Sequence, residues 1–123
     1  MIDEHDVQRI ALAFPGATEE GESRHFKANG KGFAWPYLER VEAKKPRVER
    51  RDIFVLRTSG EDVKLAMIES EPEKFFTTDH YNGYPAVMVR LELLDIEELT
   101  ELLADAHAAA IQPKKRSTRP KSP

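Results

Sequence analysis

The segment at 75–93 constrains the fold of this chain most, because a polar aromatic turn leads directly into a strand. Apolar side chains recur at every second position of that strand: Val87, Val89 and Leu91. Arg90 falls on the opposite face. A period of two is typical of a β-strand with one face buried. We therefore predict a sheet that contains a half-buried strand in this part of the chain.

A β-hairpin is predicted earlier in the chain, around the dipeptide Asn29-Gly30. Both residues tolerate the positive φ angles that a type I′ turn requires between two strands. Phe33, Trp35 and Tyr37 alternate in the strand after the turn. We expect all three rings on one buried face, where they form part of the core.

The remaining pattern predicts a central strand and three helices. Residues 53–56 are apolar on both faces, which is typical of a strand in the middle of a sheet. Ser59 with Asp62, and Asp95 with Glu98, resemble capping boxes at the starts of two helices. Together with the apolar stripes, they predict helices at about residues 3–14, 60–70 and 95–111.

The chain of 123 residues is long enough for one domain with a single core. We predict an α+β fold at residues 1–112, in which an antiparallel sheet packs one face against the N- and C-terminal helices. Residues 113–123 are rich in Lys, Arg, Ser and Pro, so we expect a disordered basic tail. The sequence has no apolar run that could span a bilayer and no secretory signal at its start. We expect a cytoplasmic protein that is not bound to a membrane.

Formal charge is distributed unevenly along the chain. The net charge is −3, from 19 Lys and Arg residues and 22 Asp and Glu residues. Five of the cations lie after residue 113, which leaves 14 cations against 22 acids, or about −8, in the preceding part. This is the wrong sign for a uniform phosphate-binding surface. Any contact with nucleic acid therefore depends on a local basic patch or on the tail.

Four short sequences, taken together, carry a family resemblance. They are Ala-Leu-Ala-Phe-Pro-Gly-Ala-Thr-Glu-Glu at 11–20, Phe-Lys-Ala-Asn-Gly-Lys-Gly-Phe-Ala at 26–34, His-Tyr-Asn-Gly-Tyr-Pro at 80–85 and the strand Val-Met-Val-Arg-Leu at 87–91. In this order and spacing they resemble the MmcQ/YjbR family of small bacterial proteins over about residues 5–111. The resemblance implies a CyaY/frataxin-like fold of the double-wing type, and it implies DNA binding. It supplies no catalytic residue.

The charged connection at 38–51, which is longer than in the shortest members of that family, carries the best candidate contact to phosphate in the folded domain. Its basic residues are Lys44, Lys45, Arg47, Arg50 and Arg51. Several cations on an exposed loop can follow a nucleic-acid backbone without fixed geometry. The alternative is an ordinary solvated loop, in which acids such as Glu49 reduce the local positive charge.

The turn before the last strand supplies a second candidate contact. His80, Tyr81 and Tyr84 have side chains that stack on bases or bind a ligand, and Gly83 permits a close approach to the backbone. The alternative is a tight connection in which the two tyrosines cover the end of the core. Both interpretations stay open from the sequence alone.

The sequence does not indicate an enzyme. Asp79 and His80 are adjacent, so their side chains point apart in an extended segment, and no nucleophile accompanies them. The histidines do not have the spacing of a metal or cofactor site. The leading hypothesis is therefore a monomeric, non-enzymatic protein that binds DNA or another nucleic acid. The alternative is a protein-interaction or small-ligand module, or a metal-binding module whose acids lie at 3–6 and 19–22.

Overall fold

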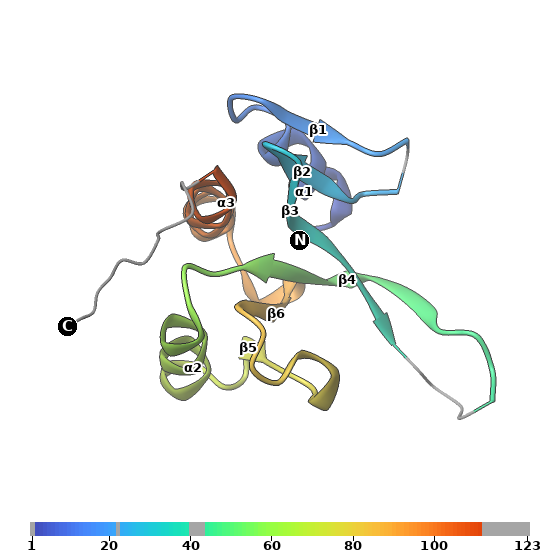
Figure 1. The fold of residues 1–123 in the computed structure, drawn as a ribbon, viewed down its shortest axis with the longest axis vertical. Helices are drawn as coiled ribbons and strands as arrows, with labels where there is room; N and C mark the ends of the chain where they lie inside the picture. Colours follow the sequence, from blue (N-terminus) through green and yellow to red (C-terminus); the bar gives the residue numbers. More distant parts are fainter. Residues whose placement is uncertain (1, 22, 40–43, 112–123) are drawn as a thin grey trace.

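The computed structural model describes residues 2–21, 23–39 and 44–111, except for the side chain of His80. In this part of the chain six strands form one sheet in the order β1-β2-β3-β4-β6-β5, and each strand is antiparallel to its neighbours. The predicted α+β class is thereby confirmed. Figure 1 shows the elements: α1 (Glu4–Ala11), β1 (Ala17–Glu19), β2 (Phe26–Ala28), β3 (Lys31–Glu39), β4 (Val48–Arg57), α2 (Glu61–Ser70), β5 (Phe75–Phe76), the 3₁₀ turn η1 (Asp79–Tyr81), β6 (Ala86–Arg90), the 3₁₀ turn η2 (Leu91–Leu93) and α3 (Ile96–Ile111).

Helix α1 begins with a capping box between Asp3 and Asp6. The side chain of Asp3 accepts a hydrogen bond from the backbone amide of Asp6, and the side chain of Asp6 accepts one from the amide of Asp3. The helix ends at Ala11 rather than at the predicted residue 14. After Ala11 the backbone continues in a tighter turn of the 3₁₀ type, in which the amide of Phe14 donates to the carbonyl of Ala11 three residues earlier.

The other two helices begin in different ways. Helix α3 begins as predicted, because the side chain of Asp95 accepts a hydrogen bond of 2.8 Å from the amide of Glu98. At α2 the residue before the helix is Gly60, and no side chain accepts a hydrogen bond there. The predicted cap by Ser59 is wrong, because Ser59 lies one position too early to be the capping residue.

All three of these α-helices pack on the same face of the sheet. Val7 and Ile10 of α1 and Leu99 and Leu103 of α3 are buried in one core cluster, and Met67 of α2 packs against it. Each fully buried side chain of this size stabilises the fold by about 1.5–3 kcal/mol. The predicted packing of the N- and C-terminal helices on one face is confirmed.

A β-bulge divides the aromatic residues of β3 between the two faces of the sheet. The pairing of β2 with β3 shifts beside Phe26 and leaves Phe33 as the extra residue. Phe33 and Ala34 therefore both join the helix-side core. Trp35 and Tyr37 pack on the opposite face, so the prediction of three rings on one face is wrong.

That opposite face carries a second, smaller cluster of buried residues: Ile53, Val55, Ala86 and Met88. We call it the open face, because no α-helix in the described part of the chain contributes to the cluster. Strand β6 is buried on both sides rather than half-buried, since Val87 and Met88 are both 0% exposed. Tyr81 and its turn cover the open side.

Both ends of the predicted connection at 38–51 belong to strands. Strand β3 runs to Glu39 and β4 begins at Val48, so these ends pair with each other. Figure 1 shows that β3 and β4 extend beyond the other strands as a two-stranded arm, which we define as residues 37–39 and 48–50. Arg50 and Arg51 consequently lie on a strand and not on a loop.

Two parts of the sequence-based prediction concern residues outside the described ones. These are the middle of the connection, at 40–43, and the basic tail at 113–123. Among the helices of the described ranges, none is both long and apolar enough to cross a membrane.

Candidate nucleic-acid interface

Four half-buried aromatic side chains meet on the open face, from three different elements. They are Trp35 and Tyr37 of β3, Phe76 of β5 and Tyr81 of η1. The indole Nε1 of Trp35 donates a hydrogen bond of 3.0 Å to the hydroxyl of Tyr81. The rings of Tyr37 and Phe76 meet edge to face, with centroids 6.4 Å apart. These contacts hold the four rings in fixed positions while part of each stays accessible.

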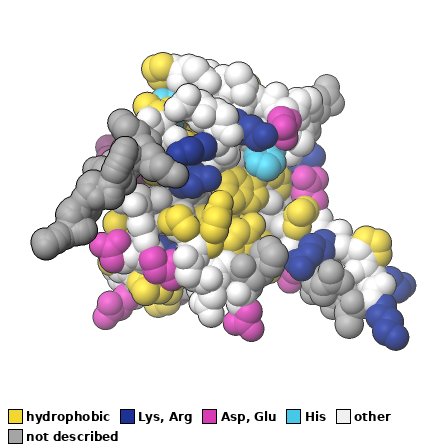
Figure 2. Space-filling model, viewed as in Figure 1, with side chains coloured by type: hydrophobic (Ala, Val, Ile, Leu, Met, Phe, Trp, Pro, Cys, Tyr) yellow, Lys and Arg dark blue, Asp and Glu magenta, His cyan; other side chains and the backbone are white. Residues whose placement is uncertain are grey.

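In Figure 2, hydrophobic side chains gather over β4 and β6 at the centre of the view, with Lys and Arg side chains near their edge.

Three neighbouring hollows open between these rings. The first, of about 430 Å³, is bordered by Tyr37 and Phe76 together with Arg50 and Arg90. The second, of about 100 Å³, lies between Tyr37 and Tyr81. The third, of about 270 Å³, is bordered by Tyr81, Trp35 and His25 among other residues. Tyr37 thus separates the first hollow from the second, and Tyr81 separates the second from the third.

The two ends of this row have different chemistry. At one end the guanidinium of Arg90 lies 4.2 Å from the centroid of the Phe76 ring, in a cation–π contact. At the other end the imidazole of His25 lies beside Trp35, with ring centroids 5.6 Å apart. Burial lowers the pKa of His25 below its usual value, an effect that the charge of Glu20 opposes in part. The imidazole is therefore mainly neutral at pH 7. The hollow at the other end has Arg50 and Arg90 together with the acids Glu39, Asp52 and Glu92, so Arg90 is a local cation and that end is not positive as a whole.

A buried lysine positions the aromatic turn. The side chain of Lys64 in α2 is 0% exposed, and its Nζ donates hydrogen bonds to the carbonyl oxygens of Tyr81 at 2.5 Å and Tyr84 at 2.9 Å. The carboxylate of Glu61 lies 3.5 Å from the same ammonium. Tyr81 is consequently held over the open face, whereas the side chain of Tyr84 is 41% exposed. The side chain of His80 lies outside the described residues.

Arg50 is bound by one acid of its own strand and by one acid of the neighbouring strand β3. Its guanidinium donates two hydrogen bonds to the carboxylate of Asp52, at 3.0 and 2.9 Å, and a further one to Glu39. These bonds, the one to Asp52 above all, raise the pKa of Arg50 further above its ordinary value. Arg50 borders the first hollow with its charge already neutralised, so it offers little net attraction to a phosphate.

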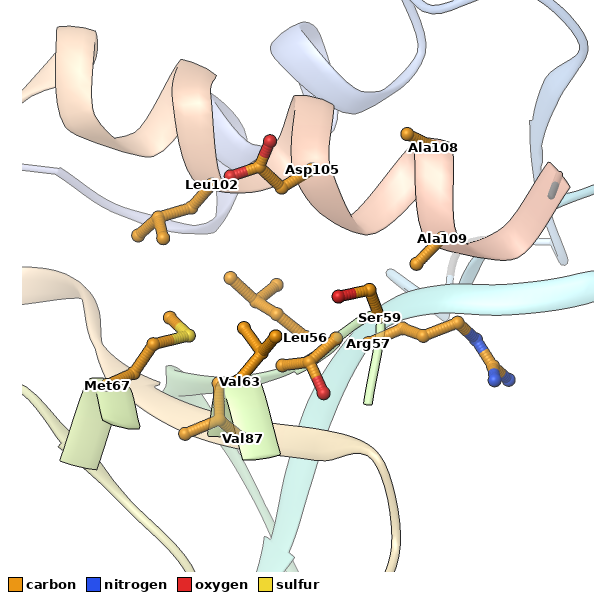
Figure 3. A pocket seen from close by; sticks show the side chains of 11 residues that line it. Leu56, Arg57, Ser59, Val63, Met67, Val87, Leu102, Asp105, Ala108 and Ala109 are labelled. Atoms are coloured by element: carbon orange, nitrogen blue, oxygen red, sulfur yellow. The ribbon is translucent and has the colours of Figure 1, made fainter. Parts of the chain in front are cut away.

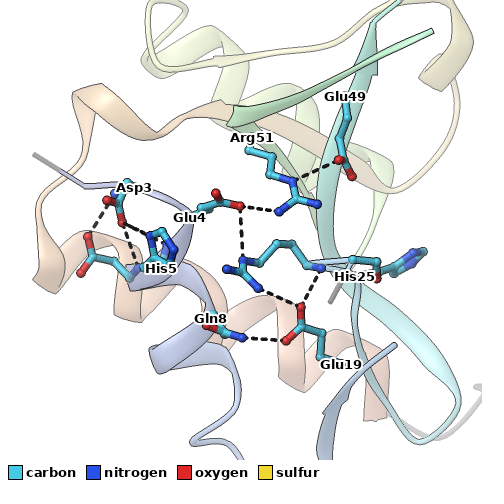
Figure 4. Close-up of polar contacts among 11 residues, drawn as sticks. Asp3, Glu4, His5, Gln8, Glu19, His25, Glu49 and Arg51 are labelled. Carbon is cyan, nitrogen blue, oxygen red and sulfur yellow. Dashed lines mark hydrogen bonds and ion pairs between the residues drawn. The ribbon is translucent and has the colours of Figure 1, made fainter. Parts of the chain in front are cut away.

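Arg51 points in the opposite direction from Arg50. Its guanidinium donates to Glu4 of α1 at 2.9 Å and to Glu49 at 3.0 Å, as Figure 4 shows. The bond to Glu4 is the main reason that the pKa of Arg51 is raised. The structure therefore does not bring the predicted basic cluster together as one patch. It divides the two arginines between the open face and the first helix.

The other members of the predicted basic cluster lie near the end of the arm. Lys44, Lys45 and Arg47 are all exposed. Arg47 donates a hydrogen bond of 3.4 Å to the carbonyl of Leu38 and borders the second hollow. Arg47 is therefore placed beside the aromatic rings of Tyr37 and Tyr81.

The acidic residues that were considered as metal ligands form ion pairs and hydrogen bonds with other residues. Glu4 and Glu19 both bind Arg24, each at 3.3 Å, and Glu20 binds Lys27 at 2.9 Å. Glu19 also accepts from Gln8, as Figure 4 shows. Within the described ranges, no three His, Asp or Glu side chains are arranged to hold a metal ion. These carboxylates instead join α1 to β1 and to the segment before β2.

Several residues of this face were missed or misread from the sequence. Trp35 and Tyr37 were interpreted as core, because the bulge that turns them onto the open face has no local signal. Arg90 had a signal, since alternation in its strand placed it opposite Val89. Lys64 had none, because a lysine within a short helix is typical of an exposed position.

The fold and this face define a class of protein: a small α+β domain whose single described sheet has helices on one side and a row of aromatic rings on the other. The chain belongs to the YjbR family, whose sequence profile matches residues 12–109. It is similar to uncharacterized proteins of Mycobacterium bovis and Mycobacterium tuberculosis, each 36% identical over 110 residues that cover 82% of both chains. The family prediction is thus confirmed. No solved structure matches the chain, so the likeness to frataxin stays a prediction.

Proposed function

We propose that this protein binds single-stranded nucleic acid on the open face of its sheet, as a binding protein and not as an enzyme. The observation that carries the proposal is the row of three hollows separated by Tyr37 and Tyr81. Unpaired bases are flat and apolar on both faces, so successive bases fit a row in which hollows alternate with aromatic rings. A duplex keeps its base faces stacked and offers no such contact.

The rings are preorganised for this role. Trp35 and Tyr81 hold each other by a hydrogen bond, and Lys64 fixes the turn that carries Tyr81. Less side-chain entropy is therefore lost when a base stacks on them. Stacking of one base on an aromatic side chain contributes about 1–3 kcal/mol, and it depends little on base identity. Two or three such contacts contribute about 2–9 kcal/mol in total, so together with a few phosphate contacts they approach the roughly 8 kcal/mol of micromolar binding without a sequence preference.

Stacking also reconciles the proposal with the charge of the chain. Residues 1–113 carry a formal charge of about −8, which disfavours binding driven by phosphate contacts alone. Arg47 and Arg90 lie beside the rings without a carboxylate partner at hydrogen-bonding distance among the described residues, so they can contact a small number of phosphates. We therefore expect an affinity that falls with salt, but less steeply than that of a protein with a continuous basic surface.

The test is fluorescence anisotropy with a labelled single-stranded 15-mer, its RNA counterpart and the matching duplex, over a series of salt concentrations. It is carried out with the full chain and with a chain that ends at residue 112. We expect both chains to bind single strands more tightly than duplex. If neither binds a single strand at low salt, the proposal is wrong. If only the full chain binds, the contact belongs to the basic tail and not to the open face.

A pair of matched variants separates stacking from general effects on the fold. Tyr37→Leu removes a ring of the open face but keeps an apolar side chain. Phe14→Leu makes the same change on the helix side, where Phe14 packs against the main core. We expect Tyr37→Leu to weaken single-strand binding about ten-fold, the equivalent of one stacked base. Phe14→Leu should leave the affinity unchanged, and equal losses in the two variants would contradict the proposal.

A second candidate function is protein binding by the arm. Leu38 is 50% exposed and Val48 is 47% exposed, and the two lie on neighbouring strands of the arm. Exposed apolar side chains of this kind occur at protein contacts. Val48→Ser should abolish capture of a protein partner from cell extract in this case. The same variant should leave single-strand binding within about two-fold, because Val48 borders none of the three hollows, whereas Leu38 borders two of them.

A further inference from the structure

A cavity of about 230 Å³ lies on the helix side of the sheet, between α2 and α3. Figure 3 shows that its floor is formed by Leu56 of β4 and Val87 of β6. Val63 and Met67 of α2 line one wall, and Leu102 lies on the wall formed by α3. The cavity is separated from the three hollows by the sheet itself, so it is independent of the proposed function.

The polar groups at this cavity differ in whether they are already engaged. Arg57 donates a hydrogen bond of 2.7 Å to the carbonyl of Gly32, and in Figure 3 its guanidinium points away from the other lining side chains. Thr58 donates from its hydroxyl to the carbonyl of Gly60 at 2.9 Å. The structure gives Ser59 and Asp105 no side-chain partner among the described residues. A hydroxyl and a carboxylate are therefore available to a bound molecule.

The carboxylates that remain available beside the cavity make its surroundings negative. Asp105 is exposed at the α3 wall, and Asp62 is exposed in the first turn of α2, close to Ser59. Glu61 adds little to this charge, because it lies 3.5 Å from the ammonium of Lys64. Arg57 is a cation of the lining, and its guanidinium is turned outward. An anionic ligand would meet this negative charge, whereas a cation would complement it.

We propose that this cavity binds a small amphipathic cation, with an apolar body of about one aromatic ring and a single amine. The apolar body lies against Leu56 and Val87, and the ammonium lies at Asp105 with Ser59 as a second acceptor. The size fits, because an apolar cavity of about 150 Å³ already holds benzene. The remaining volume accommodates a methylene and an amine. Pockets between helices that combine an apolar lining with a few polar groups are typical ligand sites.

The experiment is an NMR titration of the ¹⁵N-labelled full chain with three probes of one shape: benzylamine, benzyl alcohol and benzoate. We expect saturable shifts at the amides of Ser59, Val63 and Ala109, which all belong to the lining. Benzylamine should bind about three- to five-fold more tightly than benzyl alcohol, as for one accessible ion pair, and benzoate should bind most weakly. The absence of saturable shifts at these amides, or binding of benzoate as tight as that of benzylamine, would overturn the proposal.

Three variants assign the contacts. Asp105→Asn should remove the preference for benzylamine over benzyl alcohol, whereas Glu101→Gln, one turn earlier on the same helix and outside the lining, should keep it. Ala109→Leu places a larger side chain in the cavity and should abolish binding of all three probes. If that variant does not fold, Asp105→Asn and Glu101→Gln still decide the matter. Equal behaviour of those two variants would refute a contact at Asp105.

Discussion

The indole of Trp35 donates a hydrogen bond of 3.0 Å to the hydroxyl of Tyr81, a residue 46 positions later in the chain. The bond joins the middle of β3 to the turn before β6 across the open face. Tyr81 therefore covers part of the core and also borders two hollows. The sequence left open whether the aromatic turn covers the core or contacts a ligand. For Tyr81 the structure is compatible with both roles.

Tyr81→Phe should lower the free energy of unfolding by about 1 kcal/mol, because the indole N–H of Trp35 loses the hydroxyl of Tyr81 as its acceptor in a half-buried site. The measurement is urea unfolding followed by fluorescence, for which Trp35 is the only tryptophan of the chain. Tyr84→Phe is the control, since Tyr84 is exposed, and its change should stay within about 0.5 kcal/mol. Equal destabilisation by the two changes would contradict a specific role for the bond to Trp35.

Lys64→Met should destabilise the fold by about 2–3 kcal/mol, because the carbonyl oxygens of Tyr81 and Tyr84 each lose one of their two donors in a buried site. The same change at Lys27, whose ion pair with Glu20 is at the surface, should cost less than about 1 kcal/mol. Urea unfolding measures both. The fluorescence of Trp35 in the folded Lys64→Met variant should also shift towards that of an exposed indole. An unchanged spectrum together with unchanged stability would show that the turn does not need the buried ammonium.

Glu19 should make stability depend on acid pH. Burial alone would raise the pKa of its carboxyl, but hydrogen bonds from Gln8 and Arg24 outweigh burial and lower the pKa below its ordinary value of 4.5. A lowered pKa in the folded state stabilises the protein above the unfolded value, and this contribution is lost as the pH falls through the folded value. Stability should therefore decline below about pH 4.5.

Glu19→Gln tests this dependence by urea unfolding between pH 7 and pH 3. At pH 7 the variant should be less stable by about 1–2 kcal/mol, the range of a hydrogen bond to a charged group. Its stability should fall less between pH 4.5 and pH 3 than that of the unchanged chain. Glu101→Gln is the control, because Glu101 is exposed. A decline as steep in Glu19→Gln as in the control would assign the acid sensitivity to other carboxylates.

Arg47 and Arg51 should differ in what they contribute, if the open face binds single strands. Arg47→Ala should reduce the slope of log affinity against log salt by about 0.7, the value for one phosphate contact to a single strand. Arg51→Ala should leave that slope unchanged, because Arg51 is bound to Glu4 and Glu49. It should instead lower stability by about 1 kcal/mol. Anisotropy over a salt series measures the slope, and the reverse pattern would show that the arginines were assigned to the wrong roles.

Elements that depend on neighbouring residues were predicted correctly from the sequence. Asn29 and Gly30 have φ angles of 55° and 78°, as the predicted hairpin turn requires. Asp95 caps α3 at the predicted position, and β6 has the predicted alternation between its two faces. These features depend only on the backbone and a few adjacent side chains, so they can be predicted from a short stretch of sequence.

The candidate site was predicted less well, because its contacts join distant segments. The position of Trp35 depends on a bulge between two strands, and the burial of Lys64 depends on carbonyl groups of a turn 17 and 20 residues away. The split between Arg50 and Arg51 depends on which acids lie on each side of the arm. Local sequence patterns do not show which distant residues will become partners.

The sequence by itself determined the family, the α+β class, the hairpin turn and the last helix of this protein. The tertiary structure decided which side chains share a surface. The physical reason is that strand register and ion-pair partners are set by packing across the whole sheet, where one extra residue at Phe33 turns Trp35 and Tyr37 to the other face. The aromatic row and the cavity between α2 and α3 exist only as results of that packing.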